Sequence, residues 1–463
     1  MRMLIWMLNF VMSINIKIKF LCFITVGLLA QTGLCQSKQK FIFPPYTSGE
    51  SSIDVYNELT FAATDKNERV NDLYLEAKFN FYTYFTKNIY MFNSFLIEPV
   101  KDAEYGENRY FDDTGLWWSN LNFNFENDDL LLGIGRGAPN FSTGYATAPG
   151  IWGSDDSYDN LKVGGKWGAV LAPNIKIDKV TNFSVSGALF TADNTTLTDS
   201  YITQRGVFYR EYGGPSNTGD LDSYSLSIDA TQIKGVENLV LHGAYMNQRV
   251  THLSFDRVNY VSQDSLSNEQ RFVVSAFYTF KLNEENVLSP YFEYGNISNS
   301  LGLKGNNKGV TTASLELNSN QWTHSLAYSN VLQTDNTQTT EKDYQVSLST
   351  AYLFDNGLEV SLGYQFTNNI DEEKRHVLGT SLSFNLNSRN NVLLGSDFLK
   401  LNHKKQIIIV KRFVNSHDKL FDQESEQVIE VLTDKVVKHI KTHPNALNRP
   451  LKLIITNVLL DTG

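Results

Sequence analysis

The richest candidate for chemistry in this chain is one long loop, residues 138–160, together with the run directly after it. The loop contains Asp155, Asp156 and Asp159, and the run that follows it carries Lys162 and Lys166 on one parity. Acids on a loop that face bases on a strand produce an electric field across the space between them. Charge rings of this kind set ion selectivity without making or breaking a covalent bond. The expected chemistry is therefore the selection of solutes by charge.

A second set of charged side chains lies along the alternating runs, on the parity opposite to the apolar residues. If these runs cross a membrane, a Lys or Arg facing lipid at mid-depth costs about 2–4 kcal/mol, so we expect the set to face inward. Its members are Glu76, Lys78, Asp229, Arg271, Lys281, Glu293, Glu316 and Glu359. Both signs of charge are present, which is typical of a hydrated and weakly selective interior.

The sequence contains no recognisable catalytic motif. His242, His252, His324 and His376 have no spacing that forms a catalytic or metal-binding unit with nearby acids. GxSxG, HExxH and a phosphate-binding glycine loop are also absent. We therefore expect no metal, no cofactor and no enzymatic activity, and we keep an outer-membrane enzyme as a remote alternative. The acidic balance, 40 Lys and Arg against 50 Asp and Glu, argues against nucleic-acid binding.

The elements that carry these charges have the pattern of β-strands. In residues 73–81 and 358–366 every second residue is apolar and those between are mostly polar. Residues 117–125 follow the same rule, with one face expected to hold Trp117, Leu121, Phe123 and Phe125. A period of two identifies strands with one apolar and one polar face. Runs of about ten residues also match the length that a tilted strand needs to cross a bilayer.

The connections between these runs alternate between short and long. Outer-membrane barrels place short turns on the periplasmic side and long loops outside, whereas nothing in a soluble β-sandwich, the alternative, requires this order. About sixteen runs precede Leu386, and residues 391–400 and 404–413 would make eighteen. The sequence predicts an all-β fold, a transmembrane antiparallel β-barrel of 16–18 strands. A barrel of that size leaves an aqueous channel.

The N-terminal residues have the pattern of an export signal. Lys17 and Lys19 precede an apolar segment and a cleavage site after Cys35, which predicts a signal peptide over residues 1–35. A lipid anchor on Cys35 is the rival interpretation. Both cysteines, Cys22 and Cys35, lie in this segment, so no disulfide framework is expected. Its removal takes away three bases and no acid, which changes the net charge from -10 to -13. Residues 36–50 would form a linker and 51–414 the barrel.

The last residues, 415–463, depart from the alternating pattern and predict a tail that is periplasmic and has one short amphipathic helix. Val428, Leu432, Val436 and Ile440 recur every four residues, which indicates an apolar helix face. A last strand that closes the barrel is the alternative for this region.

The segment LGIGRG, the Gly- and Asp-rich loop after it and YDNLKVGGKWG resemble the strand, constriction loop and strand of Gram-negative general porins. In that family the loop folds into the barrel and narrows it, and the barrels are commonly trimeric. The resemblance implies that the constriction is formed by Asp155, Asp156 and Asp159 opposite Lys162, Lys166 and Arg136.

This resemblance implies a porin of the bacterial outer membrane that contacts lipid and lipopolysaccharide and passes small hydrophilic solutes by diffusion. A substrate-dedicated uptake channel, of the siderophore or sugar type, is the alternative.

Overall fold

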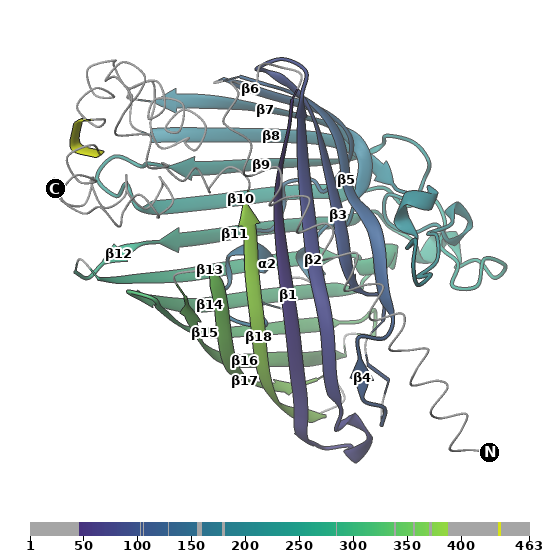
Figure 1. Ribbon diagram of the computed structural model, residues 1–463. Helices are drawn as coiled ribbons and strands as arrows, with labels where there is room; N and C mark the ends of the chain where they lie inside the picture. Colours follow the sequence, from purple (N-terminus) through teal and green to yellow (C-terminus); the bar gives the residue numbers. More distant parts are fainter. Residues whose placement is uncertain are drawn as a thin grey trace. The chain divides into compact units, whose positions relative to one another are not determined.

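The computed structural model describes residues 46–387, apart from 102, 105, 128, 155–159, 178–180, 284, 338, 355–356 and 370–372, together with residues 434–436. The first of these ranges forms one antiparallel β-barrel (Figure 1). Its wall has sixteen strands, and two further strands of two residues, β4 and β12, pair beside them. Among the described residues, no helix is long and apolar enough to cross a membrane.

The strands of the wall follow one another around the barrel in chain order. Their bounds are β1 Tyr46–Ala63, β2 Asn71–Tyr84, β3 Ile89–Pro99, β5 Thr114–Glu126, β6 Leu130–Gly137, β7 Lys166–Ile177, β8 Thr181–Ala192, β9 Ser223–Thr231, β10 Leu239–Gln248, β11 Glu269–Tyr278, β13 Asn286–Ser298, β14 Asn307–Ser319, β15 Trp322–Thr334, β16 Thr340–Leu353, β17 Leu358–Asn368 and β18 Lys374–Asn387. The short strands are β4 Arg109–Tyr110 and β12 Phe280–Lys281. The helical turns are η1 Lys66–Glu68, α2 Gly144–Thr147, η2 Thr196–Thr198, η3 Arg210–Tyr212, η4 Gln263–Ser265 and η5 Ser300–Gly302.

Pairing between the first and last strands closes the barrel. β1 pairs with β18 from Glu50 opposite Asn387 to Ala63 opposite Arg375, with one register shift near Thr60. Closure satisfies the backbone groups of both edge strands, which an open sheet would leave unpaired. The wall therefore has sixteen strands, and the eighteen-strand alternative has no place between β18 and β1. The runs 391–400 and 404–413 lie outside the described residues.

The two faces of the wall differ in the way that the alternation predicts. In β9, Leu226 and Ile228 are 55% and 47% exposed, whereas Ser225 and Ser227 between them are 3% and 4% exposed. β15 repeats this with exposed Leu326 beside buried Ser325. Large apolar side chains cover the outside and small polar ones line the inside, which confirms the predicted fold class, an all-β barrel of the transmembrane type.

A β-bulge makes one predicted face wrong. Between β3 and β5, Ser94 pairs with Asn120 but Phe95 pairs with Trp118, so Ser119 is an extra residue. An extra residue reverses the side of every residue beyond it. Trp118 consequently packs against Phe95 on one side, with 4.7 Å between ring centroids and 31° between the ring planes, and Trp117 is turned to the other side. Trp117 is 3% exposed and lies under the Arg205 guanidinium, 4.2 Å from the ring centroid.

The predicted ends of the chain lie mostly outside the described residues. β1 begins at Tyr46, inside the segment 36–50 that was predicted as a linker. The signal peptide over residues 1–35 and most of the tail over 415–463 remain predictions, and only Asp434, Lys435 and Val436 of the tail are described, as helical.

Candidate functional site

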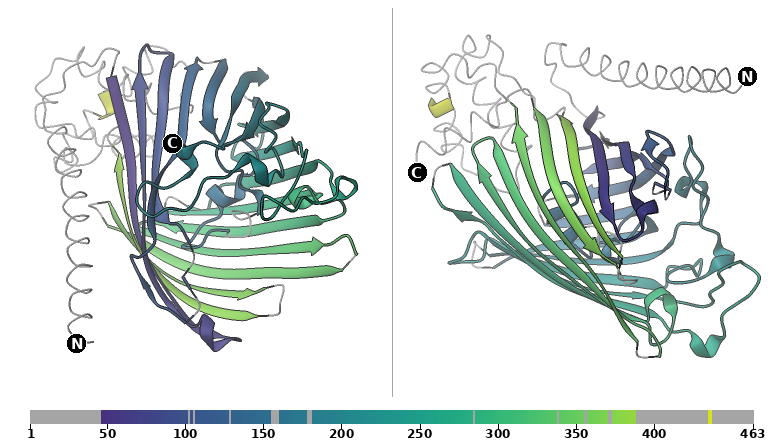
Figure 2. Two further views of the ribbon diagram at one scale, coloured as in Figure 1. Left: turned by 90° about the vertical axis from the view of Figure 1, so that its right-hand side faces the viewer. Right: turned by 90° about the horizontal axis from the view of Figure 1, so that it is seen from below.

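The described part of the long connection between β6 and β7, residues 138–154 and 160–165, lies inside the barrel and is here named the inner loop. The short helix α2 belongs to it and contacts β13 on the wall (Figures 1 and 2). Most of the side chains that bind the inner loop come from the inner faces of β9 to β18, and Phe190 of β8 and Glu58 of β1 also contact it.

The first contacts of the inner loop are with β9 and β10. Asn140 donates to Ser227 Oγ at 3.0 Å and to Asp229 Oδ2 at 3.1 Å. The carbonyl oxygen of Phe141 faces His242 Nε2, and His242 Nδ1 lies 2.7 Å from Asp229 Oδ1. These contacts fix the point at which the chain turns inward.

Glu293 on β13 holds the next three residues of the inner loop. Its carboxylate accepts hydrogen bonds from Ser142 Oγ at 2.9 Å, from the backbone N–H of Thr143 at 2.9 Å and from that of Gly144 at 3.0 Å. Tyr291 on the same strand donates to it at 3.0 Å. A carboxylate that accepts several N–H and O–H groups forms strong, charge-assisted hydrogen bonds. Glu293 is 0% exposed, so water does not compete with these bonds.

Glycines in the wall provide space for the middle of the inner loop. A Cβ on Gly379 would lie 2.5 Å from the Trp152 ring, and one on Gly363 would lie 2.8 Å from it. Any larger residue at these two positions would push the indole away from the wall. Beside Trp152, the hydroxyls of Ser154 and Thr312 are 2.9 Å apart. The loop is therefore fitted closely to β14, β17 and β18.

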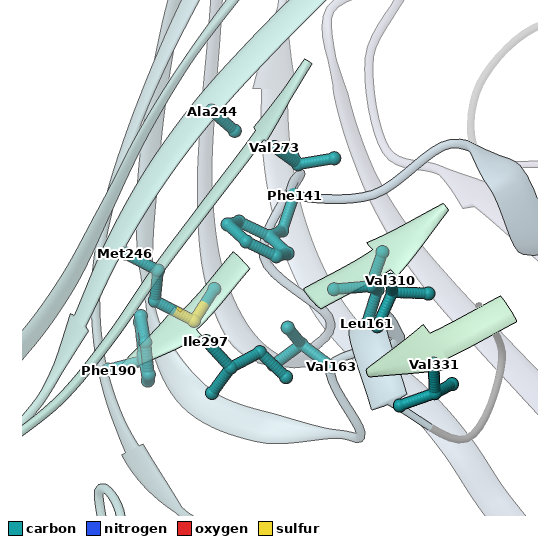
Figure 3. Packing of buried hydrophobic residues seen from close by; sticks show 10 residues of the cluster. All are labelled: Phe141, Leu161, Val163, Phe190, Ala244, Met246, Val273, Ile297, Val310 and Val331. Atoms are coloured by element: carbon teal, nitrogen blue, oxygen red, sulfur yellow. The ribbon is translucent and has the colours of Figure 1, made fainter. Parts of the chain in front are cut away.

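The returning part of the inner loop is held by two bases. Arg271 on β11 donates to the backbone oxygen of Asn160 at 3.0 Å, and Lys308 on β14 donates to Asn160 Oδ1 at 3.0 Å. A buried apolar cluster lies beneath this segment (Figure 3). The cluster joins Phe141, Leu161 and Val163 of the loop to Phe190, Ala244, Met246, Val273, Ile297, Val310 and Val331 of the wall. Both ends of the loop thus share one core with the wall.

The side of the inner loop that faces away from this cluster carries Lys162 and Tyr145. The Lys162 ammonium lies 5.7 Å from the centroid of the Tyr145 ring. Burial raises the pKa of the Tyr145 phenol, and the charge of Glu293 raises it further, so the phenol stays neutral. The Lys162 ammonium therefore lies beside an uncharged ring.

The wall opposite Lys162 carries a group of acids, here named the acidic wall: Asp54, Glu58, Glu76, Glu98 and Glu359. Glu98 is the strongest charge acting on Glu76, and Lys162 acts electrostatically on both carboxylates. Asp54 and Glu359 both pair with Ser383, from its two sides. Among the described residues, the base Lys162 lies on the loop and these acids lie on the wall. The predicted field, with acids on the loop, depends on residues 155–159 outside the described range and stays a prediction.

Arg136 has a different place from the one implied by the porin resemblance. Its guanidinium forms a buried ion pair with Asp193 and donates to the backbone oxygens of Trp118 and Ser119. These two carbonyls lie at the bulge of β5, before Leu121, which is the first residue of β5 that pairs with β6. Arg136 is 3% exposed and therefore stabilises the base of the inner loop instead of lining a passage.

The other predicted residues have different surroundings. Asp229, Arg271 and Glu293 contact the inner loop, as described above. Lys166 begins β7 and donates to Ser216 Oγ at 2.9 Å. Glu316 accepts from Asn318, while Lys78 and Lys281 are exposed. Asp155, Asp156 and Asp159 lie outside the described residues, so their place in the constriction remains a prediction.

No metal centre is present among the described residues, since none of their His, Cys, Asp and Glu side chains form a group of three or more that could hold an ion. His242 and Asp229 have the spacing of a catalytic His–Asp pair, but His242 Nε2 faces the carbonyl of Phe141 where a nucleophile would have to lie. The pair is therefore used for structure.

Sequence reasoning missed Asp54, Glu58, Glu98 and Trp152. The first two alternate with Ile53, Val55 and Leu59, so the parity rule applied to the other strands would have found them. Trp152 carries no local signal, because the glycines that accommodate it come much later in the chain.

No family model and no curated protein matches the chain. Solved structures do resemble it. OprB of Pseudomonas putida is 8% identical with a TM-score of 0.49, over 74% of this chain and 94% of that one. The outer membrane channel DcaP of Acinetobacter baumannii is 12% identical with a TM-score of 0.45, over 74% and 96%. OccAB3 of Acinetobacter baumannii is 9% identical with a TM-score of 0.44, over 73% and 99%. At these values the likeness assigns no substrate, and the barrel rests on the strand pairing of this chain.

Proposed function

We propose that this protein is an outer-membrane porin, a water-filled channel through which small hydrophilic solutes diffuse passively. The observation that carries the proposal is the inner loop, which is held by hydrogen bonds and an apolar cluster inside a closed barrel of sixteen strands. A barrel of this size is wide enough for an aqueous channel, and a loop fixed inside it sets the width.

The outer face of the wall supports a place in the lipid bilayer. Exposed Leu, Ile and Phe alternate with buried Ser along the strands, and a lipid-facing surface requires this arrangement. The short connections would then face the periplasm and the long ones the outside, in contact with lipopolysaccharide. A homotrimer is part of the same proposal, because general porins commonly assemble in this way.

The acidic wall gives the proposed channel a preference for cations. Its five carboxylates lie on β1, β2, β3 and β17, and Lys162 on the loop acts electrostatically on two of them, Glu76 and Glu98. Fixed charges at a narrow point raise the local concentration of ions of opposite sign. Partial screening at physiological salt keeps the preference modest, since the Debye length there is about 8 Å.

The selectivity is tested by reversal potentials in a salt gradient across a planar bilayer. Glu76→Gln with Glu98→Gln lowers the cation preference, and Lys162→Gln raises it. The matched control, Glu237→Gln with Glu285→Gln, removes the same charge from exposed turns and leaves the potential unchanged. Equal reversal potentials for the wild type and the Glu76/Glu98 variant would show that the acidic wall does not set the ion selectivity. Asp155→Asn with Asp156→Asn tests the predicted loop acids in the same way.

Swelling of protein-loaded liposomes in sugars of increasing size separates general diffusion from a substrate-dedicated channel. Passive diffusion gives rates that fall smoothly with solute size. A dedicated channel gives one solute a rate far above others of equal size, and that solute inhibits the passage of the rest.

A further inference from the structure

Both ring nitrogens of His242 face hydrogen-bond acceptors. Nδ1 lies 2.7 Å from Asp229 Oδ1, and Nε2 contacts the backbone oxygen of Phe141. A neutral imidazole carries one N–H and an ionised carboxylate carries none. Both contacts are hydrogen bonds only when the His242–Asp229 pair holds two protons, one more than a neutral histidine beside an ionised aspartate.

Burial opposes a second proton on the imidazole, but the charged groups that act on it, Asp229 on β9 and Glu293 on β13, are both acids and attract that proton. From the inner loop the neighbours are Asn140, which donates to the far oxygen of Asp229, and the Phe141 carbonyl, neither of which titrates. His242 is 5% exposed, so water cannot replace a lost contact easily.

We propose that His242 is a positioning residue that ties the start of the inner loop to the wall only while the His242–Asp229 pair holds both protons. When one proton leaves, a nitrogen lone pair faces an oxygen lone pair, and the buried contact becomes repulsive. Residues 140–147 then loosen at the Phe141 end, while Glu293 still holds residues 142–144. In the proposed channel, on which this consequence rests, the inner loop fluctuates more at high pH than at low pH.

The structure also provides a variant that keeps the tether without the extra proton. In Asp229→Asn, the amide oxygen still accepts from Asn140 and the amide nitrogen donates to His242 Nδ1. A neutral His242 then donates from Nε2 to Phe141 O, and every group is satisfied. His242→Gln removes the titrating ring altogether. His324→Gln is the matched control, because His324 is exposed on β15 and bonds Thr350 on the wall.

The test is hydrogen exchange of peptides that cover residues 138–147, read by mass spectrometry on the folded protein in lipid nanodiscs. Rates are corrected for intrinsic exchange from about pH 5 to about pH 9, a range that spans histidine titration. In the wild type and in His324→Gln, corrected exchange rises about tenfold, as expected for the loss of one buried hydrogen bond. In Asp229→Asn it stays slow throughout, and in His242→Gln it does not change with pH.

A flat profile in the wild type overturns the proposal, and so does a wild-type rise that persists in Asp229→Asn. If His242→Gln fails to fold, Asp229→Asn alone decides. Current fluctuations recorded over the same pH range separate this inference from the proposed function. If exchange rises with pH in a protein that conducts no current, the tether stands and the proposed channel is rejected. If the protein conducts and its exchange profile is flat, the proposed channel stands and the tether is rejected.

Discussion

Glu293 shows how one buried side chain determines the position of a loop. Its two oxygens accept from Ser142, Thr143 and Gly144, so the backbone of the inner loop is bound to the wall directly. The residue was predicted from parity as an inward-facing charge. Its binding to the loop could not be predicted, since Ser142 lies 151 positions away in the sequence.

Glu293→Gln tests this anchor. The variant keeps one acceptor oxygen but loses the charge, and a hydrogen bond to a charged group contributes about 1.5–3 kcal/mol. We expect faster hydrogen exchange at Thr143 and Gly144 and larger fluctuations of the open-channel current. Glu316→Gln makes the same change on β14, where the carboxylate bonds Asn318 of its own strand, and should alter neither readout. An unchanged exchange rate in Glu293→Gln would mean that the loop is held mainly by its apolar cluster.

At the scale of single elements, the strand β5 and the base of the inner loop depend on each other. The bulge at Ser119 turns Trp117 inward and leaves the carbonyls of Trp118 and Ser119 for Arg136. Alternation predicted β5 as a strand but not the reversal, because a bulge shifts the register without interrupting the apolar pattern. Alternation also could not place Arg136. This residue shares parity with Ile134, yet it lies in a buried ion pair with Asp193.

Arg136→Met tests the ion pair at this base. Removal of one partner leaves Asp193 buried without its counter-charge, which typically costs about 3–5 kcal/mol. Asp193 also binds Trp167 and Thr195, so the connection between β8 and β9 opens locally. We expect faster trypsin cleavage at Arg205 and Arg210, with partial recovery when Asp193→Asn is added. Arg69→Met, at an exposed position, should be cleaved like the wild type, and equal rates in Arg136→Met would contradict the role of the pair.

At the scale of the whole molecule, much of the architecture follows from the sequence. Strand length and the order of short and long connections predict an antiparallel barrel, whereas the inward fold of residues 138–160 was implied only by the resemblance to general porins. Strand number needs the structure, because the pairing of β1 with β18 involves residues at opposite ends of the described chain. The direction of the electric field across the interior also requires the structure, because it depends on which acids lie opposite Lys162 across the barrel.

The central claim, that the inner loop lies in an open water-filled passage, is tested most directly by single-channel recording. Purified protein, shown to be folded by its heat-modifiable migration, is added to a planar bilayer. We predict stepwise current increases whose size grows in proportion to the conductivity of the bathing salt, as in a hydrated pore. Folded protein that inserts into the bilayer and produces no such steps at any salt concentration would contradict the account.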